Sequence, residues 1–313
     1  MKLAFVFPGQ GSQSVGMMTV LAAGFPVVKQ TFDEASQALG FDLWQVVEQG
    51  PDTRLNQTEV TQPAMLAAGV ATWRVWLAHN GPRPHFMAGH SLGEYTALVC
   101  AEAINYSDAM KLVMDRGRYM QQAVPAGQGG MAAILGLDDE AVRKLCAQAA
   151  QGEVLEAVNF NSPGQVVIAG AAAAVSRAVD QSKAAGAKRA ITLPVSVPAH
   201  CRLMHPAAER MAERLRQVDI HRPQVPVIHN AHVQAESDPQ AIRNALVRQI
   251  ESPVRWVETI QKMAANGVDR LVECGPGRVL TGLNKRIVKT AETLPVFDPS
   301  TRHDALAALA NAS

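Results

Sequence analysis

The chain has 313 residues, a net charge of +1, 48% hydrophobic residues and 18% charged residues. These proportions are typical of a globular protein with a sizeable core, and the balanced charge argues against a protein whose main task is to bind nucleic acid. The four cysteines form no Cys-x-x-Cys pair, no apolar run approaches the roughly 20 residues that span a bilayer, and the first apolar run is too short for a signal peptide, so we expect a cytoplasmic protein with neither a zinc site nor a membrane segment.

The first part of the sequence predicts two short strands among helices. Residues 3–7 form an apolar run that ends at Pro8, and residues 85–90 form another, so both are predicted strands. The stretch between the first strand and residue 61 is predicted to be mainly helical. Further helices are predicted over residues 62–79, 92–103 and 107–123. The last of these helices has Ser107 as its predicted N-cap.

The middle of the chain has a different pattern. Residues 125–130 are rich in glycine and predict a linker. Strands are then predicted over residues 131–136, 154–160, 165–169 and 188–195, and helices over residues 138–150 and 172–185. Their order along the chain is βαββαβ, which is the order of a ferredoxin-like domain.

The last part returns to alternating strands and helices. Short strands are predicted over residues 225–229 and 269–273, and helices over residues 203–217, 238–250, 253–266 and 278–289. Strands that alternate with helices predict a mainly parallel sheet. We therefore expect an α/β main domain, formed by residues 1–126 and 198–313, that is interrupted by a smaller inserted domain, residues 127–197.

The most specific motif is Gly-x-Ser-x-Gly at residues 89–93, between a predicted strand and a predicted helix. This is the context of a nucleophile elbow, in which the glycines allow a sharp turn that exposes the serine hydroxyl. Ser91 is therefore the candidate nucleophile. The backbone N–H of Leu92 lies at the helix N-terminus, where it can stabilise an oxyanion. The alternative is a chance Gly/Ser turn, which the strand and helix on either side disfavour.

A serine nucleophile needs a base, and the chain has nine histidines. His200 is the best candidate, because it lies in a loop that follows the inserted domain and precedes a helix. His90 adjoins Ser91, but on a sharp turn its side chain points elsewhere, so we expect it to be a supporting residue. From spacing alone, a structural role for any one histidine is favoured over a catalytic one.

Arg116 is the most informative residue of the predicted helix 107–123. At about 100° per residue it lies at the centre of the apolar face, between Leu112 and Met120, whereas Arg118 lies on the opposite face. An inward arginine needs an anionic partner, because an unpaired buried charge is costly. That partner is either an internal carboxylate, in a structural ion pair, or the carboxylate of a ligand bound in bidentate fashion.

The loop after the first strand is also rich in glycine. It lacks the third glycine of a Rossmann fingerprint, where Ser14 stands, and it has no P-loop lysine. We therefore interpret this loop as the lip of an active site rather than a nucleotide cradle. The backbone N–H of Gln10 can face an oxyanion there.

Several motifs, in one order along nearly the whole chain, together resemble a single family. They are Phe7-Pro8-Gly9-Gln10-Gly11-Ser12-Gln13, Gly89-His90-Ser91-Leu92-Gly93-Glu94-Tyr95, Arg116, Asn159-Phe160-Asn161-Ser162-Pro163-Gly164-Gln165, His200 and Gln249 within residues 248–253. They resemble the malonyl-CoA:acyl-carrier-protein transacylases of bacterial fatty-acid synthesis. The resemblance implies an α/β-hydrolase-like core with a mainly parallel sheet and an inserted ferredoxin-like subdomain.

The resemblance also implies a role for each matching residue. Ser91 is implied to be the nucleophile that accepts malonyl, and His200 is implied to be its general base. The main-chain carbonyl of Gln249 is implied to orient His200 in place of a triad acid. The backbone N–H groups of Gln10 and Leu92 are implied to form the oxyanion hole.

Substrates and partners follow from the same resemblance. Arg116 is implied to bind the malonyl carboxylate, and Asn159 to shape the site near the base. Malonyl-CoA and acyl carrier protein are the implied partners, with no metal or redox cofactor, no nucleic acid and no membrane. Ala199 stands where relatives that accept malonyl often have serine or a larger residue, which leaves the tolerance for branched extender units open. We expect a monomeric, free-standing enzyme.

Other functions stay open on the sequence. A serine esterase or thioesterase shares the elbow but needs an acid between serine and histidine. The aspartates in that interval, none with a convincing loop-after-strand context, are Asp108, Asp115, Asp138, Asp139 and Asp180. A non-catalytic carrier-protein scaffold would not need a nucleophile, a base and an inward arginine together. The same malonyl transfer can also serve malonate decarboxylase or a polyketide pathway.

Carrier proteins are acidic, so a basic docking patch is expected despite the balanced charge. Lys188-Arg189 and Lys285-Arg286 are the candidates. They are equally well explained as solvated surface charges.

Overall fold

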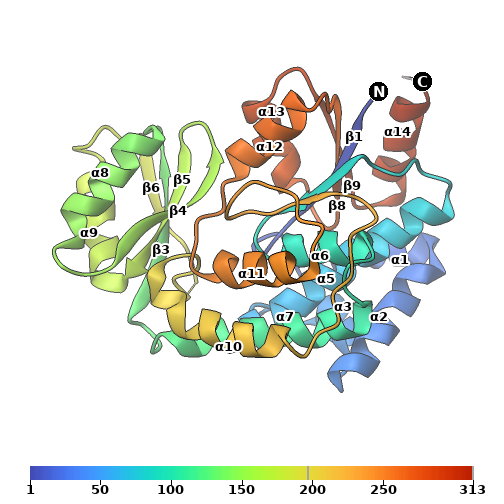
Figure 1. Cartoon of the computed structure of the whole chain (residues 1–313), viewed down its shortest axis with the longest axis horizontal. Helices are drawn as coiled ribbons and strands as arrows, with labels where there is room; N and C mark the ends of the chain where they lie inside the picture. Colours follow the sequence, from blue (N-terminus) through green and yellow to red (C-terminus); the bar gives the residue numbers. More distant parts are fainter. Residues whose placement is uncertain (196, 312–313) are drawn as a thin grey trace.

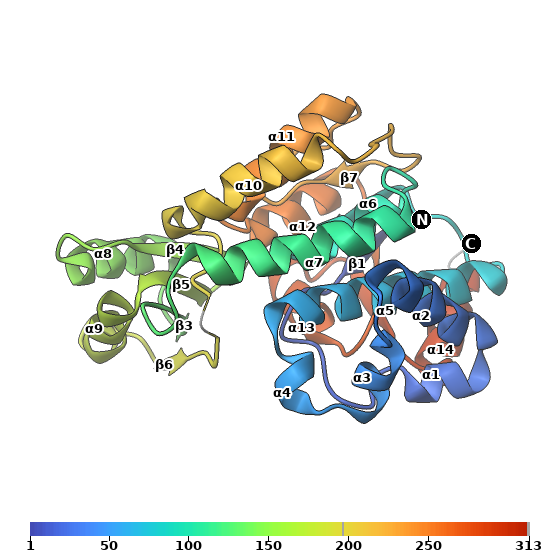
Figure 2. The same cartoon turned by 90° about the horizontal axis from the view of Figure 1, so that it is seen from below.

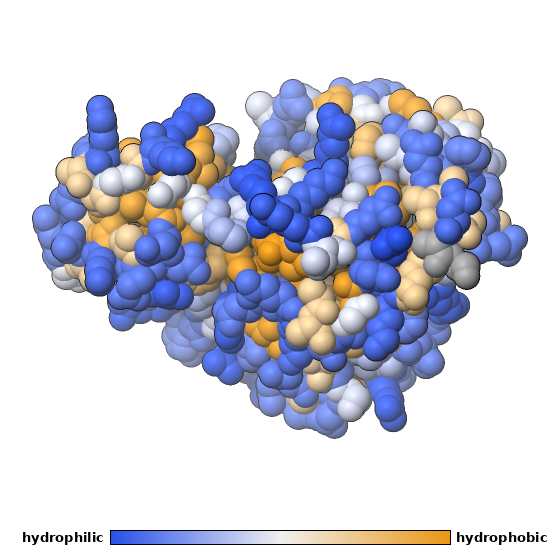
Figure 3. Space-filling view, turned by 90° about the horizontal axis from the view of Figure 1, so that it is seen from above, coloured by the Kyte–Doolittle hydropathy of each residue, from blue (hydrophilic) through white to orange (hydrophobic). Residues whose placement is uncertain are grey.

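Two separate β-sheets organise the chain into a larger and a smaller lobe (Figure 1). The computed structural model describes residues 1–195 and 197–311. Seen from above, a notch separates the lobes at the surface (Figure 3). The chain forms part of the larger lobe, then all of the smaller one, and then completes the larger one.

The sheet of the larger lobe is parallel and is buried on both faces. Its order is β7-β2-β1-β8-β9, and every recorded pairing in it is parallel. Along β1, Leu3, Phe5 and Phe7 pack into one core and Ala4 and Val6 into another. Burial on both faces is why β1 is a continuous apolar run in the sequence. The strands are β1 Leu3–Phe7, β2 Phe86–Gly89, β7 Val227–Ile228, β8 Arg270–Cys274 and β9 Glu292–Val296.

Helices cover both faces of this sheet. The long helix α7 runs along the larger lobe and ends beside the smaller one (Figure 2). The helices before the small lobe are α1 Thr19–Gly24, α2 Pro26–Leu39, α3 Leu43–Gln49, α4 Asp52–Leu55, α5 Thr58–Ala78, α6 Gly93–Cys100 and α7 Tyr106–Ala123. Those after it are the 3-10 turn Arg202–Met204, α10 His205–Leu215, α11 Pro239–Ile250, α12 Trp256–Ala265, α13 Val279–Ile287 and α14 Pro299–Ala310. No helix within residues 1–195 and 197–311 is both long enough and apolar enough to cross a membrane.

The sheet of the smaller lobe is antiparallel, with the order β4-β5-β3-β6. Its elements are β3 Gly129–Leu135, α8 Asp139–Ala150, β4 Leu155–Ser162, β5 Gln165–Ala171, α9 Ala172–Ser182 and β6 Arg189–Thr192. Helices α8 and α9 share one core with this sheet. The other face of the sheet, which includes Met131 and Val158, packs against Cys201 in the larger lobe.

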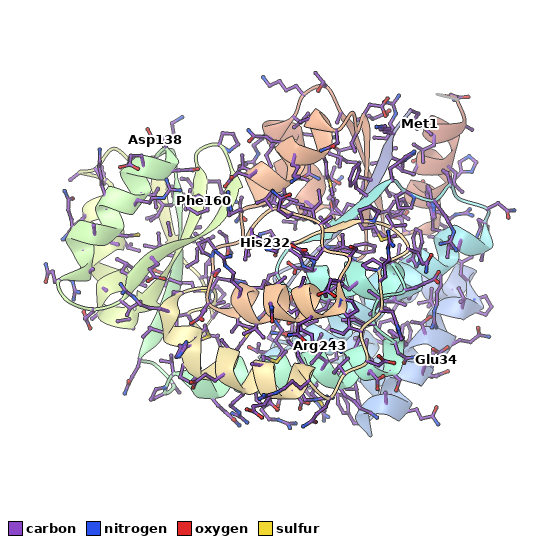
Figure 4. The ribbon with its side chains drawn as sticks, viewed as in Figure 1. Met1, Glu34, Asp138, Phe160, His232 and Arg243 are labelled. Atoms are coloured by element: carbon purple, nitrogen blue, oxygen red, sulfur yellow. The ribbon has the colours of Figure 1, made fainter. Side chains whose placement is uncertain are left out.

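The two lobes are joined by backbone hydrogen bonds at the edge strand β4. The N–H of Phe160 donates to the carbonyl of Val254 at 3.0 Å, and the N–H of Val254 donates to the carbonyl of Val158 at 2.8 Å. Phe160 lies on the side of the small lobe that faces the larger one (Figure 4). Because Val254 closely follows the end of α11, this junction lies beside the last turn of that helix, which carries Gln249.

The structure confirms an α/β fold with a mainly parallel sheet and a separate antiparallel sheet, and it corrects several details. Helix α7 begins at Tyr106, and its N-cap is Asn105, not Ser107, because the Asn105 side chain accepts the N–H of Ser107 at 2.9 Å. The predicted linker 125–130 ends earlier than expected, because Gly129 and Gly130 pair with β5 as the start of β3. The chain also forms β9 and α14, for which no element was predicted.

Candidate active site

A strained turn at the end of β2 presents the Ser91 hydroxyl. Ser91 has a positive φ of 51°, a conformation that most side chains avoid. The neighbouring glycines are required by close packing: a Cβ on Gly89 would lie 1.8 Å from the carbonyl carbon of Gly93, and a Cβ on Gly93 would lie 2.1 Å from the carbonyl oxygen of Phe7. The turn therefore has the form of a nucleophile elbow.

The side chain of Ser91 lies beside that of His200. The distance from Ser91 Oγ to His200 Nε2 is 2.7 Å, and His200 Nδ1 lies 2.8 Å from the main-chain carbonyl oxygen of Gln249. A carbonyl can only accept, so Nδ1 carries the proton and Nε2 is free to accept one from the serine. The arrangement can thus activate the hydroxyl by general-base catalysis.

His200 is held in the neutral form. Its side chain is 2% exposed, and burial, with the nearby charge of Arg116 as the second cause, lowers its pKa to about 3. A charged imidazole would be poorly solvated there and would face a cation. The imidazole is therefore unprotonated at neutral pH.

Arg116 projects from α7 to the same point and is 1% exposed. Its guanidinium donates to Gln62 Oε1 at 2.9 Å, to Gln249 Oε1 at 3.0 Å and to Ser91 Oγ at 3.3 Å. These partners are neutral, and no carboxylate of the described residues comes within 4.0 Å of Arg116. Burial accordingly lowers the pKa of Arg116 below its ordinary value. Of the two interpretations that the helix pattern left open, a structural ion pair has no support.

A small pocket opens beside these three side chains. It has a volume of about 120 Å³, somewhat smaller than the roughly 150 Å³ of a protein cavity that binds benzene. Its lining mixes polar and apolar side chains from both lobes: Gln10, Thr58, Gln62, His90, Ser91, Leu92, Arg116, Met120, Met131, Asn159, Leu193, Val195, Val197, Ala199 and His200. All the sequence-predicted site residues lie here except Gln249, which reaches the site through its carbonyl and its buried side chain.

Comparison with known proteins shows which family this chain belongs to. Residues 4–309 match the acyl transferase domain family. The malonyl CoA-acyl carrier protein transacylase of Salmonella typhimurium is 56% identical over 305 residues, which are 97% of this chain and 99% of that protein. The chain belongs to the acyl transferase family.

Solved structures agree with this assignment. An acyl carrier protein S-malonyltransferase from Vibrio cholerae is 59% identical with a TM-score of 0.95, covering 97% of this chain and 99% of that one. A malonyl-transacylase solved in complex with a type II PKS acyl-carrier protein is 55% identical with a TM-score of 0.97, covering 98% of this chain and 100% of that one. This acyl transferase therefore shares the fold of these two proteins over nearly its whole length.

The smaller lobe supplies two asparagines to the site of the acyl transferase. Asn159 lines the pocket, and its buried Oδ1 has no hydrogen-bond partner among the described residues. Asn161 Oδ1 lies 2.7 Å from Nε2 of His90, so this ring nitrogen of His90 is paired with the smaller lobe. Burial lowers the pKa of His90, so its Nε2–H can donate to the amide oxygen without an added charge.

Sequence reasoning missed several residues that hold the acyl transferase site together. Asn230 Oδ1 accepts the N–H of Ser91 at 2.7 Å, and Glu94 is fully buried behind the elbow. Gln62 holds the guanidinium of Arg116, and the side chain of Gln249 contacts Arg116 as well. The motif around Ser91 already contained Glu94, but nothing local indicated its partners.

Among the described residues, no carboxylate takes the place of the Gln249 carbonyl beside His200 Nδ1. The recorded partner of His200 Nδ1 is the Gln249 carbonyl. Of the aspartates between serine and histidine, Asp115 pairs with Arg214 at 2.8 Å and Asp138 caps α8. The described residues also contain no cluster of three or more His, Cys, Asp or Glu side chains that could hold a metal ion.

Proposed function

We propose that this acyl transferase moves a malonyl group from malonyl-CoA to the phosphopantetheine thiol of an acyl carrier protein, for fatty-acid synthesis. The observation that carries the proposal is the buried guanidinium of Arg116, which lies 3.3 Å from Ser91 Oγ and has only neutral partners. A free carboxylate distinguishes malonyl from acetyl, and a buried arginine binds a carboxylate through two parallel hydrogen bonds.

In the first step, Ser91 Oγ attacks the thioester carbonyl while His200 Nε2 takes the hydroxyl proton. The carbon–sulfur bond then breaks, and the proton moves from His200 to the leaving CoA sulfur. In the second step, the carrier thiol gives its proton to His200 and attacks the serine ester, and Ser91 leaves with that proton. The geometry that supports this sequence is the 2.7 Å contact between the two side chains.

The remaining roles are part of the same proposal. The carbonyl of Gln249 orients His200, and the backbone N–H groups of Gln10 and Leu92 stabilise the oxyanion of each tetrahedral intermediate. Asn159 shapes the pocket beside the base. Every bond made or broken involves the serine, the histidine and the two thiols, so we propose that the transfer needs no metal or redox cofactor.

The lobes support a finer description of the fold. We assign residues 1–126 and 198–313 to an α/β-hydrolase-like core, and residues 127–197 to an inserted ferredoxin-like subdomain. The parallel sheet with the elbow after β2 supports the first assignment. The βαββαβ order and the antiparallel sheet support the second. A monomeric enzyme in the cytoplasm is the setting that we propose for this activity.

A second candidate is the same transfer to a polyketide carrier protein. It is favoured by the similarity to the malonyl-transacylase that was solved with a type II PKS acyl-carrier protein. The chemistry and the residues are the same in both cases. Only the carrier differs.

The test is a transfer assay with purified protein, malonyl-CoA and two holo-carrier proteins, one from fatty-acid synthesis and one from a polyketide pathway. Intact-protein mass spectrometry follows each carrier, and released malonate is measured in parallel. We expect the fatty-acid carrier to gain malonyl faster than water releases it. Preferential loading of the polyketide carrier would favour the second candidate. Rapid release of malonate with neither carrier loaded would indicate a thioesterase instead.

A further inference from the structure

A buried carboxylate behind the elbow has no role in the transfer steps above. Glu94 lies in the first turn of α6 and is fully buried. Its Oε1 is 2.7 Å from His229 Nδ1, and its Oε2 accepts the N–H of Asn230 at 2.8 Å and the side-chain amide of Gln249 at 3.0 Å. A buried charge with three donors is a fixed point in the structure, because moving it would leave donors without partners.

The side chain of Gln249 connects Glu94 to the reacting groups. Its Nε2 donates to Glu94 and, at 2.9 Å, to the main-chain carbonyl of Ser91. Its Oε1 accepts from Arg116 at 3.0 Å. Only one orientation of the amide satisfies all three partners, since the oxygen must face the cation and the nitrogen must face the carboxylate. Glu94 therefore fixes which end of the amide is turned to Arg116.

Asn230 forms a second connection between Glu94 and the elbow. While its backbone N–H binds Glu94, its side chain accepts the N–H of Ser91 at 2.7 Å and donates to the carbonyl of Gly89 at 2.7 Å. Both arms thus end at the strained turn, but only the Gln249 arm also holds Arg116.

We propose that Glu94 is a positioning residue for acyl selectivity: its carboxylate holds the Gln249 amide, and that amide holds Arg116 in the orientation that receives the substrate carboxylate. The inference rests on the proposed malonyl transfer. The side-chain amide of Gln249 lies between the Glu94 carboxylate and the Arg116 guanidinium, so Glu94 does not pair with Arg116 and the guanidinium remains available to the substrate. This positioning role depends on the length of the Glu94 side chain, because one of its oxygens must lie within hydrogen-bond distance of Gln249 Nε2.

The experiment compares acyl-enzyme formation from malonyl-CoA and acetyl-CoA, with kcat and KM resolved for each. Glu94→Asp keeps the charge but withdraws the carboxylate by one methylene, so malonyl-over-acetyl selectivity should fall about tenfold or more. Glu94→Gln keeps the reach and one acceptor oxygen, so its selectivity should stay within about threefold of wild type. The new NH₂ group of the glutamine faces His229 Nδ1, so Nδ1 must accept a hydrogen bond instead of donating one. The ring proton of His229 then moves to Nε2, which has no hydrogen-bond partner among the described residues. Glu94→Gln should therefore lose stability rather than selectivity.

A double-mutant cycle tests the route through Gln249. Gln249→Ala removes the amide but keeps the carbonyl that binds His200, and it should lower selectivity as Glu94→Asp does. The double variant Glu94→Asp/Gln249→Ala should be no less selective than Gln249→Ala alone, because both changes break one chain of contacts. Additive losses in the double variant would overturn the route.

Glu273→Gln is the matched control. Among the described residues, Glu273 is the other fully buried glutamate, and it accepts the backbone N–H groups of Leu280 and Thr281 at 3.0 and 2.6 Å, at the start of α13. Its replacement should lower stability without changing selectivity. Folding of every variant is checked by circular dichroism.

The outcomes separate this inference from the proposed function. Equal losses for malonyl and acetyl in folded Glu94→Asp, or a less selective Glu94→Gln than Glu94→Asp, would overturn the positioning role. If Glu94→Asp does not fold, the comparison of Gln249→Ala with Glu94→Gln decides, since only the first should lose selectivity. A wild-type enzyme that forms no malonyl-enzyme would contradict the proposed function itself.

Discussion

Arg116 is a buried cation whose recorded hydrogen-bond partners are neutral, so replacing it should change which acyl group is accepted rather than whether acyl transfer occurs. Arg116→Ala should lower kcat/KM for malonyl-CoA by about 10²-fold or more, because a bidentate charged pair is lost. Transfer of acetyl should persist or rise, since the serine and the base are unchanged. Arg116→Lys should restore malonyl transfer only in part, because an ammonium cannot reproduce the planar fork.

Arg118→Ala is the control for that series. Arg118 lies two residues away on α7, is 43% exposed and pairs with Glu59, so its loss should be nearly silent. Steady-state kinetics with both thioesters provide the measurement. If Arg116→Ala folds and loses malonyl and acetyl transfer equally, the selectivity role is wrong.

The lowered pKa of His200 predicts an unusual pH profile. With a pKa of about 3, the base stays unprotonated across neutral and mildly acidic pH, so kcat/KM for acylation should lack the acidic limb near 6.5 of an ordinary imidazole. The profile is measured from pH 5 to 8 with malonyl-CoA. A fall centred near 6.5 that is assigned to His200 would contradict the buried, neutral base.

The same shift predicts how stability depends on pH. The folded-state pKa of His200 lies below its unfolded value, so the unfolded chain binds more protons and the free energy of unfolding falls as pH drops from about 6.5 towards 3. The loss from this residue is at most about 1.4 kcal/mol per pH unit. Urea unfolding of wild type and His200→Gln at pH 7 and pH 5 isolates it, because the variant should lose less stability on acidification. If both proteins lose the same free energy of unfolding between pH 7 and pH 5, His200 is not the cause of this pH dependence.

Individual residues differed in how well the sequence predicted them. The Gly-x-Ser-x-Gly motif is enough to predict Ser91 as the nucleophile, and the helical periodicity is enough to predict that Arg116 faces inward. The partners of Glu94 do not, because Asn230 and Gln249 lie 136 and 155 residues further along the chain. Such contacts are created by tertiary packing, and a polar residue in the sequence carries no sign of the distant group that it will meet.

At the scale of secondary-structure elements, the start of α7 determines where Arg116 is placed. Asn105 caps this helix by accepting the N–H of Ser107. Asn105→Ala should therefore lower the free energy of unfolding by about 1 kcal/mol, whereas Ser107→Ala should change it by less than about 0.5 kcal/mol. Urea denaturation followed by circular dichroism measures both. A larger effect from Ser107→Ala would restore Ser107 as the cap.

The last two elements, β9 and α14, were not predicted because their sequences carry weak patterns. Edge strand β9 contains Pro295 and only two buried residues, so its sequence lacks a clear strand pattern. Helix α14 buries only Ala305 and Leu309, which gives little periodicity, although Asp298 and Thr301 form a capping box at its start. Both are recognisable once the neighbouring sheet is known.

At the scale of the whole molecule, the two lobes share the pocket, and a carrier protein must reach it from the surface. Lys285 is exposed at the end of α13. Lys285→Glu should raise KM for an acidic carrier about threefold at low salt, and added salt should reduce the difference. Acyl-enzyme formation from malonyl-CoA should be unchanged.

Lys144→Glu on α8 is the matched control for docking. Lys144 is 70% exposed and lies on the smaller lobe, so reversing its charge should leave the KM for the carrier unchanged. If Lys285→Glu leaves the KM for the carrier unchanged, the Lys285-Arg286 pair is solvated surface charge and not a docking patch.

In the proposed transfer, Ser91 carries the malonyl group between the two thiols. The most direct measurement is intact-protein mass spectrometry after brief incubation with malonyl-CoA, with wild type and Ser91→Ala side by side. Wild type should gain the mass of one malonyl group and lose it when holo-acyl carrier protein is added, while Ser91→Ala gains none. A malonyl adduct that persists in Ser91→Ala, or a wild-type adduct that the carrier does not collect, would contradict the account.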